Sequence, residues 1–315
     1  NILYGWAMSQ PLPTGNFRWL GEQEIREFTP EFIQSIADDS STGYVAEVDL
    51  VYPEELHEIH NAFPLAPERL VTTKDMLSPY ALSFDRDFLP AEKLVPNLQD
   101  KQNYTTHYRN LKLYLELGLR MTKVHRVLAF DQSAFMKAYI DKNTDKRKQA
   151  KDDFEKDFFK LLNNSVFGKT MENVREHIDI KLVTNHHRLK KLAAKPNCKF
   201  FERINDELAL VNMGKQNVLL NKPIYVGFSI LEVSKTLMYD FHYNKIMRRY
   251  GAERATLLFT DTDSLCYKIQ TENLYEDMHQ DRHFYDTSNY PAQHYLFSAI
   301  NGNVLGKFED ETASV

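Results

Sequence analysis

The order of apolar and polar residues predicts a series of strands and helices. Alternating or continuous apolar runs indicate strands at residues 1–8, 43–52, 122–130 and 178–183, and hairpins at residues 200–211 and 255–269. Apolar residues at helical spacing indicate helices at residues 108–117 and 226–249, with Gly118 as the C-cap of the first. Residues 61–103 hold five prolines, which predicts an irregular connection.

The stretch from Gln132 to Glu176 contains no proline and a single glycine, Gly168. Its apolar positions recur at helical spacing and predict two helices with a turn near residues 143–146. Strands and helices do not alternate regularly along the chain. We therefore expect an α+β fold rather than a doubly wound parallel sheet.

Composition limits the class of protein. The chain has 315 residues, of which 43% are hydrophobic, so it can form a sizeable core. It has no apolar stretch of membrane-spanning length, no signal-peptide pattern, and only two cysteines, Cys198 and Cys266. We therefore expect a soluble intracellular protein without a membrane partner, in a compartment that the sequence does not specify.

Charge is unevenly distributed. The net charge of −5 is unusual for a protein that binds nucleic acid. Residues 22–58 carry eleven acidic and one basic side chain, whereas residues 120–151 carry nine basic and three acidic ones. A charge run is most often a solvated face, so this distribution by itself assigns no partner.

The sequence Asp261-Thr262-Asp263 separates two apolar strands. A hairpin at this point presents both carboxylates at the end of a rigid pair of strands. Because like charges this close repel each other, a turn without function has little reason to hold both. Magnesium prefers oxygen ligands and typically takes one or two carboxylates together with substrate phosphates. The turn predicts a magnesium site for nucleotidyl transfer, although aspartate and threonine are also common in turns that bind nothing.

Three lysines form a second candidate group. Lys148, Lys156 and Lys160 are separated by eight and four residues and predict a stripe along one helix, which Asn164 extends. A line of ammonium groups is suited to a triphosphate, and Asn164 and Phe167 at its end are suited to a base or a sugar. The alternative is that Lys148 and Lys156 are solvated and that Lys160 pairs with nearby acids.

Three segments, in chain order, resemble motifs of family B DNA polymerases. Residues 160–168, Lys-Leu-Leu-Asn-Asn-Ser-Val-Phe-Gly, resemble motif B, with Phe167 in the position of its tyrosine. Residues 259–264, Phe-Thr-Asp-Thr-Asp-Ser, resemble motif C. Residues 1–8 resemble the second half of motif A in the viral, organellar and transposon branch, which often uses protein priming. The resemblance covers essentially the whole chain.

The resemblance implies a role for each matching residue. Asp263 would be the principal catalytic metal ligand and Asp261 a supporting catalytic carboxylate. Tyr4 would lie under the incoming sugar and exclude ribose. The other implied nucleotide contacts are those of Lys160 to the triphosphate, with Lys148 and Lys156 as helpers, and of Asn164 and Phe167 to the nascent base pair. The implied DNA contacts are Ser165, Gly168, Thr262 and Lys307.

The resemblance also implies an architecture and a reaction. It implies a palm of antiparallel sheet with packed helices and an inserted hairpin of finger helices. The implied bounds are palm at 1–130 with an irregular insertion, fingers at 131–170, palm again at 171–300 with the motif C hairpin, and the start of a thumb at 301–315. The reaction would be template-directed attack of a primer 3′-hydroxyl on a deoxynucleoside triphosphate, with two Mg²⁺ ions and release of pyrophosphate. The implied partners are a DNA primer-template, deoxynucleoside triphosphates and, as in part of this branch, a terminal priming protein.

One metal ligand of the motif set is not in the sequence. The motif A aspartate would lie two places before Asn1, so a third carboxylate is expected upstream of residue 1. The leading hypothesis is a polymerase fragment, and the alternative is a catalytically inactive remnant that binds nucleotide or DNA. RNA-dependent polymerases and reverse transcriptases tend to carry adjacent aspartates, whereas Thr262 separates the two here. An acidic scaffold would bind neither DNA nor deoxynucleotide. Residues 57–60, His-Glu-Ile-His, are one residue too short for a zinc-protease signature and predict a solvated acidic helix.

Overall fold

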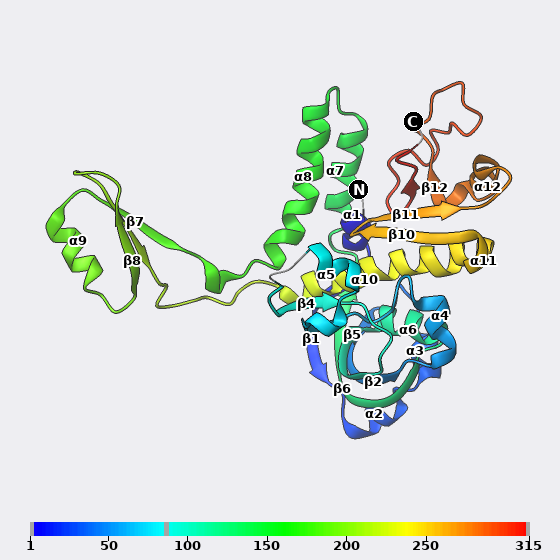
Figure 1. Ribbon diagram of the computed structural model, residues 1–315, viewed down its shortest axis with the longest axis horizontal. Helices are drawn as coiled ribbons and strands as arrows, with labels where there is room; N and C mark the ends of the chain where they lie inside the picture. Colours follow the sequence, from blue (N-terminus) through cyan, green and yellow to red (C-terminus); the bar gives the residue numbers. More distant parts are fainter. Residues whose placement is uncertain (1–2, 85–87, 313–315) are drawn as a thin grey trace. The chain divides into compact units, whose positions relative to one another are not determined.

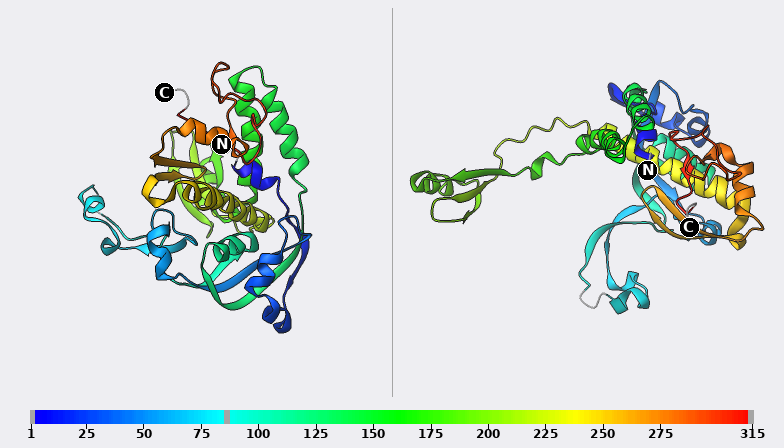
Figure 2. Two further views of the ribbon diagram at one scale, coloured as in Figure 1. Left: turned by 90° about the vertical axis from the view of Figure 1, so that its right-hand side faces the viewer. Right: turned by 90° about the horizontal axis from the view of Figure 1, so that it is seen from above.

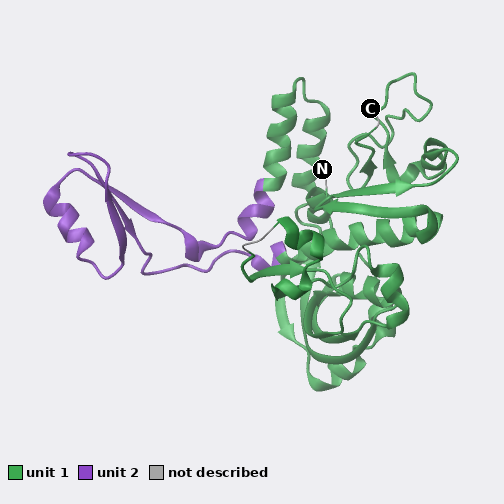
Figure 3. Cartoon of the chain, viewed as in Figure 1, with its two compact units in different colours: residues 1–164, 228–315 green, residues 165–227 purple. Residues whose placement is uncertain are grey.

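The computed structural model describes residues 3–84 and 88–312. The chain forms two compact units, shown in different colours in Figure 3. Unit 1 comprises residues 1–164 and 228–315, and unit 2 comprises residues 165–227.

Unit 1 contains a four-stranded antiparallel sheet with the strand order β1-β6-β2-β5. Its strands are β1 (Leu12–Trp19), β2 (Thr42–Val51), β5 (Lys101–His107) and β6 (Arg120–Ser133). The sheet curves around α6 (Tyr108–Glu116), as Figures 1 and 2 show. Alternate β2 side chains, Ala46, Val48 and Leu50, are buried against Leu111 and Tyr114 of α6. The two predicted strands and the predicted helix are confirmed.

The predicted cap of α6 is also confirmed. Gly118 has a φ of +104°, in the left-handed region that favours glycine. The backbone N–H of Leu119 donates to the carbonyl of Tyr114 at 3.0 Å and closes the helix end.

The prediction of an irregular connection at residues 61–103 is wrong in part. β3 (Glu68–Thr72) and β4 (Ala91–Val95) form an antiparallel pair within it, and α5 (Pro79–Phe84) lies between them. The prolines do not interrupt these elements because of where they lie. Pro67 and Pro90 each precede a strand, and Pro79 is the first residue of a helix, where the missing N–H costs little.

Residues 3–8 form a helix, α1 (Leu3–Met8), and not the predicted strand. The first two residues of that prediction lie outside the described residues. A short run that is apolar throughout has no period, so the sequence does not distinguish a buried strand from a buried helix. The helix ends at Ser9, whose hydroxyl donates to the carbonyl of Trp6 at 2.7 Å.

Two helices follow β6, as predicted, but the turn between them lies later than expected. α7 (Lys137–Lys148) continues through residues 143–146, because the buried Thr144 hydroxyl donates to the Ile140 carbonyl and Asn143 donates to the side chain of Asn163. α8 (Asp153–Thr170) begins after residues 149–152. There the Asp152 carboxylate accepts the backbone N–H of Glu155 at 2.8 Å and caps the new helix.

The predicted long helix and the hairpin after it are both present. α10 (Ile224–Asp240) continues into the π-helical segment η4 (Phe241–Met247) and then into α11 (Arg248–Arg254). β10 (Ala255–Asp261) and β11 (Ser264–Ile269) form the antiparallel hairpin. Its side chains Leu265, Tyr267 and Ile269 pack against Phe241 and Ile246 of η4.

Unit 2 is a three-stranded antiparallel sheet with the order β7-β9-β8. Its strands are β7 (Asp179–Val183), β8 (Cys198–Arg203) and β9 (Ala209–Met213). Helix α9 (His186–Ala193) covers one face of the sheet through Leu189 and Leu192, which contact Val183, Val211 and Met213. The predicted strand at 178–183 and hairpin at 200–211 are confirmed.

The remaining elements are short. They are α2 (Glu22–Glu27), α3 (Pro30–Ser35), η1 (Glu54–Leu56), α4 (His57–His60), η2 (Lys74–Met76), η3 (Val174–Glu176), α12 (Leu274–Gln280), η5 (Arg282–Phe284), β12 (Tyr285–Asp286) and β13 (Phe308–Glu309). β12 and β13 pair in parallel, and the other sheets are antiparallel. The fold therefore mixes helices with mainly antiparallel sheets. None of the helices in the described part of the chain is long and apolar enough to cross a membrane.

Helix α4 corrects the prediction for residues 57–60. It is not solvated throughout, because His60 is only 3% exposed. Its Nδ1 is 2.9 Å from the Tyr52 hydroxyl, and its ring lies against that of Tyr243. Tyr243 lies far along the chain, so no local pattern indicated this burial.

Candidate active site

The carboxylates of Asp261 and Asp263 lie at the turn of the β10–β11 hairpin. Asp261 pairs with Ser264 at the end of the ladder, so residues 262 and 263 make the turn. Thr262 has a φ of +46°, which is rare for a β-branched residue and costs on the order of 1–3 kcal/mol. Its hydroxyl donates to Asp261 Oδ1 at 3.3 Å. The tight turn holds the exposed Asp261 side chain and the half-buried Asp263 side chain one residue apart.

The phenol of Tyr4 interacts electrostatically with this turn. Helix α1 places its half-buried phenol within electrostatic range of Asp263. Burial raises the pKa of the Tyr4 phenol, and the negative charge of Asp263 raises it further. A tyrosine of helix α1 and a carboxylate of the β10–β11 turn, far apart in the sequence, therefore lie within electrostatic range of each other in unit 1.

The two aspartates have the donor type that magnesium requires. Each supplies carboxylate oxygens, and Mg²⁺ commonly binds through one or two protein carboxylates plus the phosphates of a substrate. Among residues 3–84 and 88–312 there is no group of three or more His, Cys, Asp or Glu side chains that could hold a metal ion. The turn thus fits a magnesium ion that shares its ligands with a substrate, in preference to an ion held in a closed protein site.

The three lysines do not share one helix. Lys148 is the last residue of α7, whereas Lys156 and Lys160 lie on α8, so the predicted single stripe is wrong for Lys148. The turn at residues 149–152 is the reason. Lys156, Lys160 and Asn164 lie on one face of α8 at spacings of four residues.

The surroundings of the lysines differ. Lys148 lines a cavity of about 510 Å³ between α1, α7 and residues 303–305. Lys156 is exposed and forms an ion pair with Asp153 at 3.0 Å. Lys160 is half-buried, and no ion pair to another described residue involves it.

The end of the motif B segment crosses from unit 1 into unit 2. Asn164 is the exposed last residue of the first part of unit 1, and Ser165, Phe167 and Gly168 belong to unit 2. Ser165 and Gly168 are exposed and Phe167 is half-buried. A Cβ at Gly168 would meet no described atom within 4 Å, so intramolecular packing does not require a glycine there. The predicted contacts of these residues remain predictions.

Lys307 has an intramolecular partner. It is half-buried, and its ammonium group donates to the carbonyl of His283. A role in contacting a primer therefore remains a prediction from the resemblance.

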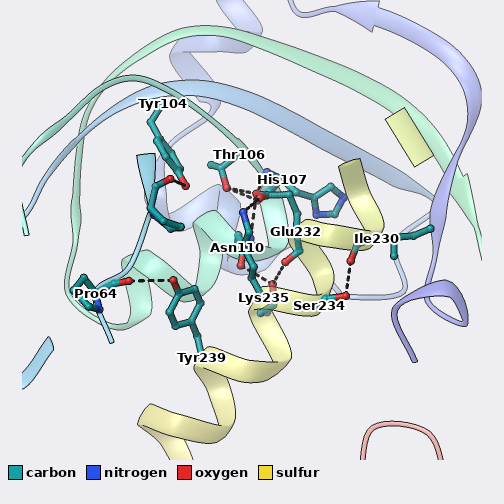
Figure 4. Close-up of polar contacts among 12 residues, drawn as sticks. Pro64, Tyr104, Thr106, His107, Asn110, Ile230, Glu232, Ser234, Lys235 and Tyr239 are labelled. Carbon is teal, nitrogen blue, oxygen red and sulfur yellow. Dashed lines mark hydrogen bonds and ion pairs between the residues drawn. The ribbon is translucent and has the colours of Figure 1, made fainter. Parts of the chain in front are cut away.

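The sequence did not single out a buried carboxylate in α10, Glu232. Thr106, the backbone N–H of His107 and Asn110 donate to its Oε2, and Lys235 pairs with its Oε1 at 2.8 Å (Figure 4). Burial raises the pKa of this carboxyl, but Lys235 and the hydrogen bonds outweigh burial and hold it below its usual range. The network fastens α10 to β5 and α6. The sequence feature that could have indicated this network is the presence of a glutamate and a lysine within the apolar run of residues 226–238.

Comparison with known proteins identifies the family. The chain resembles the orthorhombic crystal form of phi29 DNA polymerase at a TM-score of 0.49 and 15% identity, over 91% of this chain and 40% of that one. It also resembles phi29 DNA polymerase complexed with primer-template DNA and incoming nucleotide substrates, at a TM-score of 0.48 and 15% identity, over 88% and 39% of the two chains. The chain thus spans about 40% of the length of these polymerases. No curated protein matches it. Residues 1–246 match the family of DNA polymerase type B, organellar and viral, and the chain, as its three motifs predicted, belongs to this family.

Proposed function

We propose that the chain carries the palm and fingers of a template-directed DNA polymerase. The reaction is transfer of a deoxynucleotide to a primer 3′-hydroxyl with release of pyrophosphate. The observation that carries the proposal is the electrostatic interaction of Tyr4 in α1 with Asp263 at the strained hairpin turn. In a member of this polymerase family, the pair supports a site for a nucleotide sugar next to a site for its metal-bound phosphates.

Each residue has a distinct part in the proposal. Asp261 and Asp263 hold magnesium, which when bound neutralises charge on the triphosphate and lowers the pKa of the attacking hydroxyl. Lys160, whose ammonium group is free of ion pairs among the described residues, contacts the triphosphate. Lys148 and Lys156 assist it, and Asn164 and Phe167 line the nascent base pair.

Tyr4 selects the sugar. A tyrosine phenol is neutral at physiological pH, and burial raises its pKa further, so it adds no charge beside the phosphates. A neutral ring packed under the sugar leaves no room for a 2′-hydroxyl. We infer that Tyr4 excludes ribonucleotides by this contact.

The charge of unit 2 supports a DNA partner. Residues 165–227 contain 11 basic and six acidic residues, a net charge of +5 in a chain whose total is −5. An excess of lysine and arginine favours phosphate contacts that do not depend on sequence. Ser165, Gly168, Thr262 and Lys307 complete the proposed DNA contacts. The subdivision into palm (1–130 and 171–300), fingers (131–170) and the start of a thumb (301–315), and a terminal priming protein as partner, are part of the same proposal.

Primer extension tests the proposal. The unmutated protein is incubated with primer-template DNA, deoxynucleoside triphosphates and magnesium. We expect Asp263→Ala to lower extension by at least about a hundredfold, because a lost metal ligand removes several kcal/mol of transition-state stabilisation. Asp39→Ala, which removes an exposed aspartate on the surface of unit 1, serves as the control. Where the parental protein extends the primer, equal extension by the two variants would reject the site.

The second candidate function is nucleotide or DNA binding without catalysis. The observation in its favour is that the described residues provide a pair of carboxylates and no larger cluster. It predicts that the chain binds primer-template DNA and deoxynucleotide but does not extend the primer. Titration of both ligands at a fixed, stated salt concentration separates this outcome from an inert scaffold, which binds neither.

A further inference from the structure

Helix α1 presents two aromatic side chains in different directions. Tyr4 and Trp6 are two residues apart, so they project about 200° apart around the helix axis. The Tyr4 phenol lies within electrostatic range of Asp263 in the hairpin turn. Trp6 therefore faces the opposite side, where it lines the cavity formed with α7 and residues 303–305.

Gly306 packs against the edge of the Trp6 indole. Its φ is +80°, a conformation that other L-residues rarely adopt. A Cβ at this position would lie 2.6 Å from Trp6 Cδ1 and 2.8 Å from Nε1, closer than real contacts allow. Only glycine lets the backbone of residue 306 approach the indole this closely.

A second group holds Trp6 from another side. The Arg109 guanidinium lies 5.7 Å from the centroid of the Trp6 ring, within the range of a cation–π contact. Arg109 is buried and fixed by Asp38 at 2.9 Å and by the side chain of Gln10 at 3.3 Å. Trp6 is thus confined between a fixed cation and a glycine backbone.

A helix of six residues does not hold its own position, because so short a helix is unstable without tertiary packing. The buried side chains Leu3, Ala7 and Met8 anchor one side of α1. Confinement of Trp6 fixes the other side, and with it the position of Tyr4 relative to Asp263. We propose that Gly306 and Trp6 are positioning residues for the sugar-selecting Tyr4, acting through α1. The proposal rests on the proposed function and extends it to a segment that the sequence assigned to the start of the thumb.

Discrimination between deoxy- and ribonucleotides tests the proposal. In the polymerase that contains this chain, the ratio of kcat/KM for a deoxynucleotide to that for the matching ribonucleotide is measured in Gly306→Ala, Trp6→Ala and the double variant. We expect each single variant to lower the ratio about tenfold, since a displacement of about 1 Å is enough for such a loss. The double variant should resemble Trp6→Ala alone, because the added methyl group no longer meets an indole.

Two controls separate this effect from general loss of stability. Gly118→Ala places a Cβ at another glycine with positive φ, where the three nearest atoms belong to the flexible Leu56 side chain, and should leave the ratio unchanged. In a Trp19→Phe background, Trp6 is the sole tryptophan, and Gly306→Ala should shift its fluorescence emission to longer wavelength as the indole is displaced. This emission is recorded below the melting temperature of every variant.

The outcomes distinguish the two proposals. If Tyr4→Ala leaves the ratio unchanged, the role of Tyr4 in the proposed function fails. If Tyr4→Ala lowers the ratio but Gly306→Ala does not, the positioning role alone is overturned. An equal effect of Gly306→Ala in the parental and Trp6→Ala backgrounds would also overturn it.

Discussion

Lys160 differs from its neighbours on α8 in being half-buried without an ion pair among the described residues. Lys156, one turn earlier, is already paired with Asp153. A partly desolvated ammonium group without a partner binds a phosphate more strongly than a solvated one, because its charge is less screened. The structure therefore favours Lys160 over Lys156 as the main triphosphate contact.

We predict that Lys160→Ala raises the KM for deoxynucleotide about tenfold, the cost of one charge-assisted hydrogen bond. Steady-state primer extension at varied deoxynucleotide concentration measures it. Lys142→Ala is the control, since Lys142 is exposed on α7 and does not line the cavity at Lys148. The same KM in both variants would count against a triphosphate contact by Lys160.

Single residues show what the sequence could and could not indicate. The resemblance to polymerase motifs identified Tyr4 and Asp263, and the structure brings them within electrostatic range of each other. Lys148 was wrongly included in the lysine stripe, because the first helix ends at Lys148. The second helix begins after Asp152, whose carboxylate caps it, and an aspartate alone does not reveal such a cap in the sequence. The packing of Gly306 on Trp6 could not be predicted from the sequence, because the two residues are far apart in the chain and no pattern near either one indicates the contact.

At the scale of elements, the β10–β11 hairpin depends on η4 beneath it. Tyr267 of β11 and His242 of η4 stack with ring centroids 5.8 Å apart, and the Tyr267 hydroxyl lies 2.8 Å from His242 Nδ1. The other ring nitrogen of His242, Nε2, is buried and has no partner among the described residues. The hydrogen bond to the Tyr267 hydroxyl is therefore the one that the His242 imidazole makes with a described side chain.

We predict that Tyr267→Phe destabilises the protein by about 1–3 kcal/mol, because it leaves a buried imidazole nitrogen unsatisfied. The midpoint of urea unfolding gives the change. Tyr80→Phe, at a tyrosine that is 75% exposed, should have almost no effect. A Tyr267→Phe protein as stable as the parent would show that the hydroxyl contributes nothing to the hairpin.

The elements that were predicted well share a physical feature. Buried side chains recur along much of β2 at every second residue, and the apolar residues of α6 recur at helical spacing, so these sequences carry a period of two or of 3.6 residues. α1 is short and apolar throughout, β4 is largely exposed, and the five residues of β3 place Leu70 and Val71 side by side, so none of these segments gives a period to detect. Tertiary packing decides their form.

For the molecule as a whole, three buried histidines link stability to pH. Burial lowers the pKa of His60 to about 4, that of His107 to about 3 and that of His242 to about 4. His57 also lowers the pKa of His60, and His60 that of His242. At His107, the nearby Arg109 lowers the pKa while Glu232 and Asp38 oppose it. All three histidines lie in unit 1.

The sign of the effect follows from proton binding. Between the unfolded pKa of 6.5 and the folded values near 4, the unfolded chain binds protons that the folded chain does not. The contribution of these histidines to the free energy of unfolding is therefore constant above about pH 6.5. It falls as the pH drops from 6.5 towards 4. Each histidine contributes on the order of 3 kcal/mol to the loss. Carboxyls with lowered pKa, such as those of Asp49 and Glu232, continue the decline at lower pH.

We predict that the free energy of unfolding of unit 1 falls steeply between pH 6.5 and pH 4. Both tryptophans, Trp6 and Trp19, lie in unit 1, so their fluorescence during urea unfolding reports this unit alone. His60→Gln removes one of the three titrating groups and should flatten the decline by about a third, whatever its effect at pH 7. A urea midpoint that stays constant from pH 7 to pH 5 would mean that the buried histidines gain protons as readily in the folded protein as in the unfolded chain. In that case the surroundings of these histidines in α4, β5 and η4 would have to be open to water.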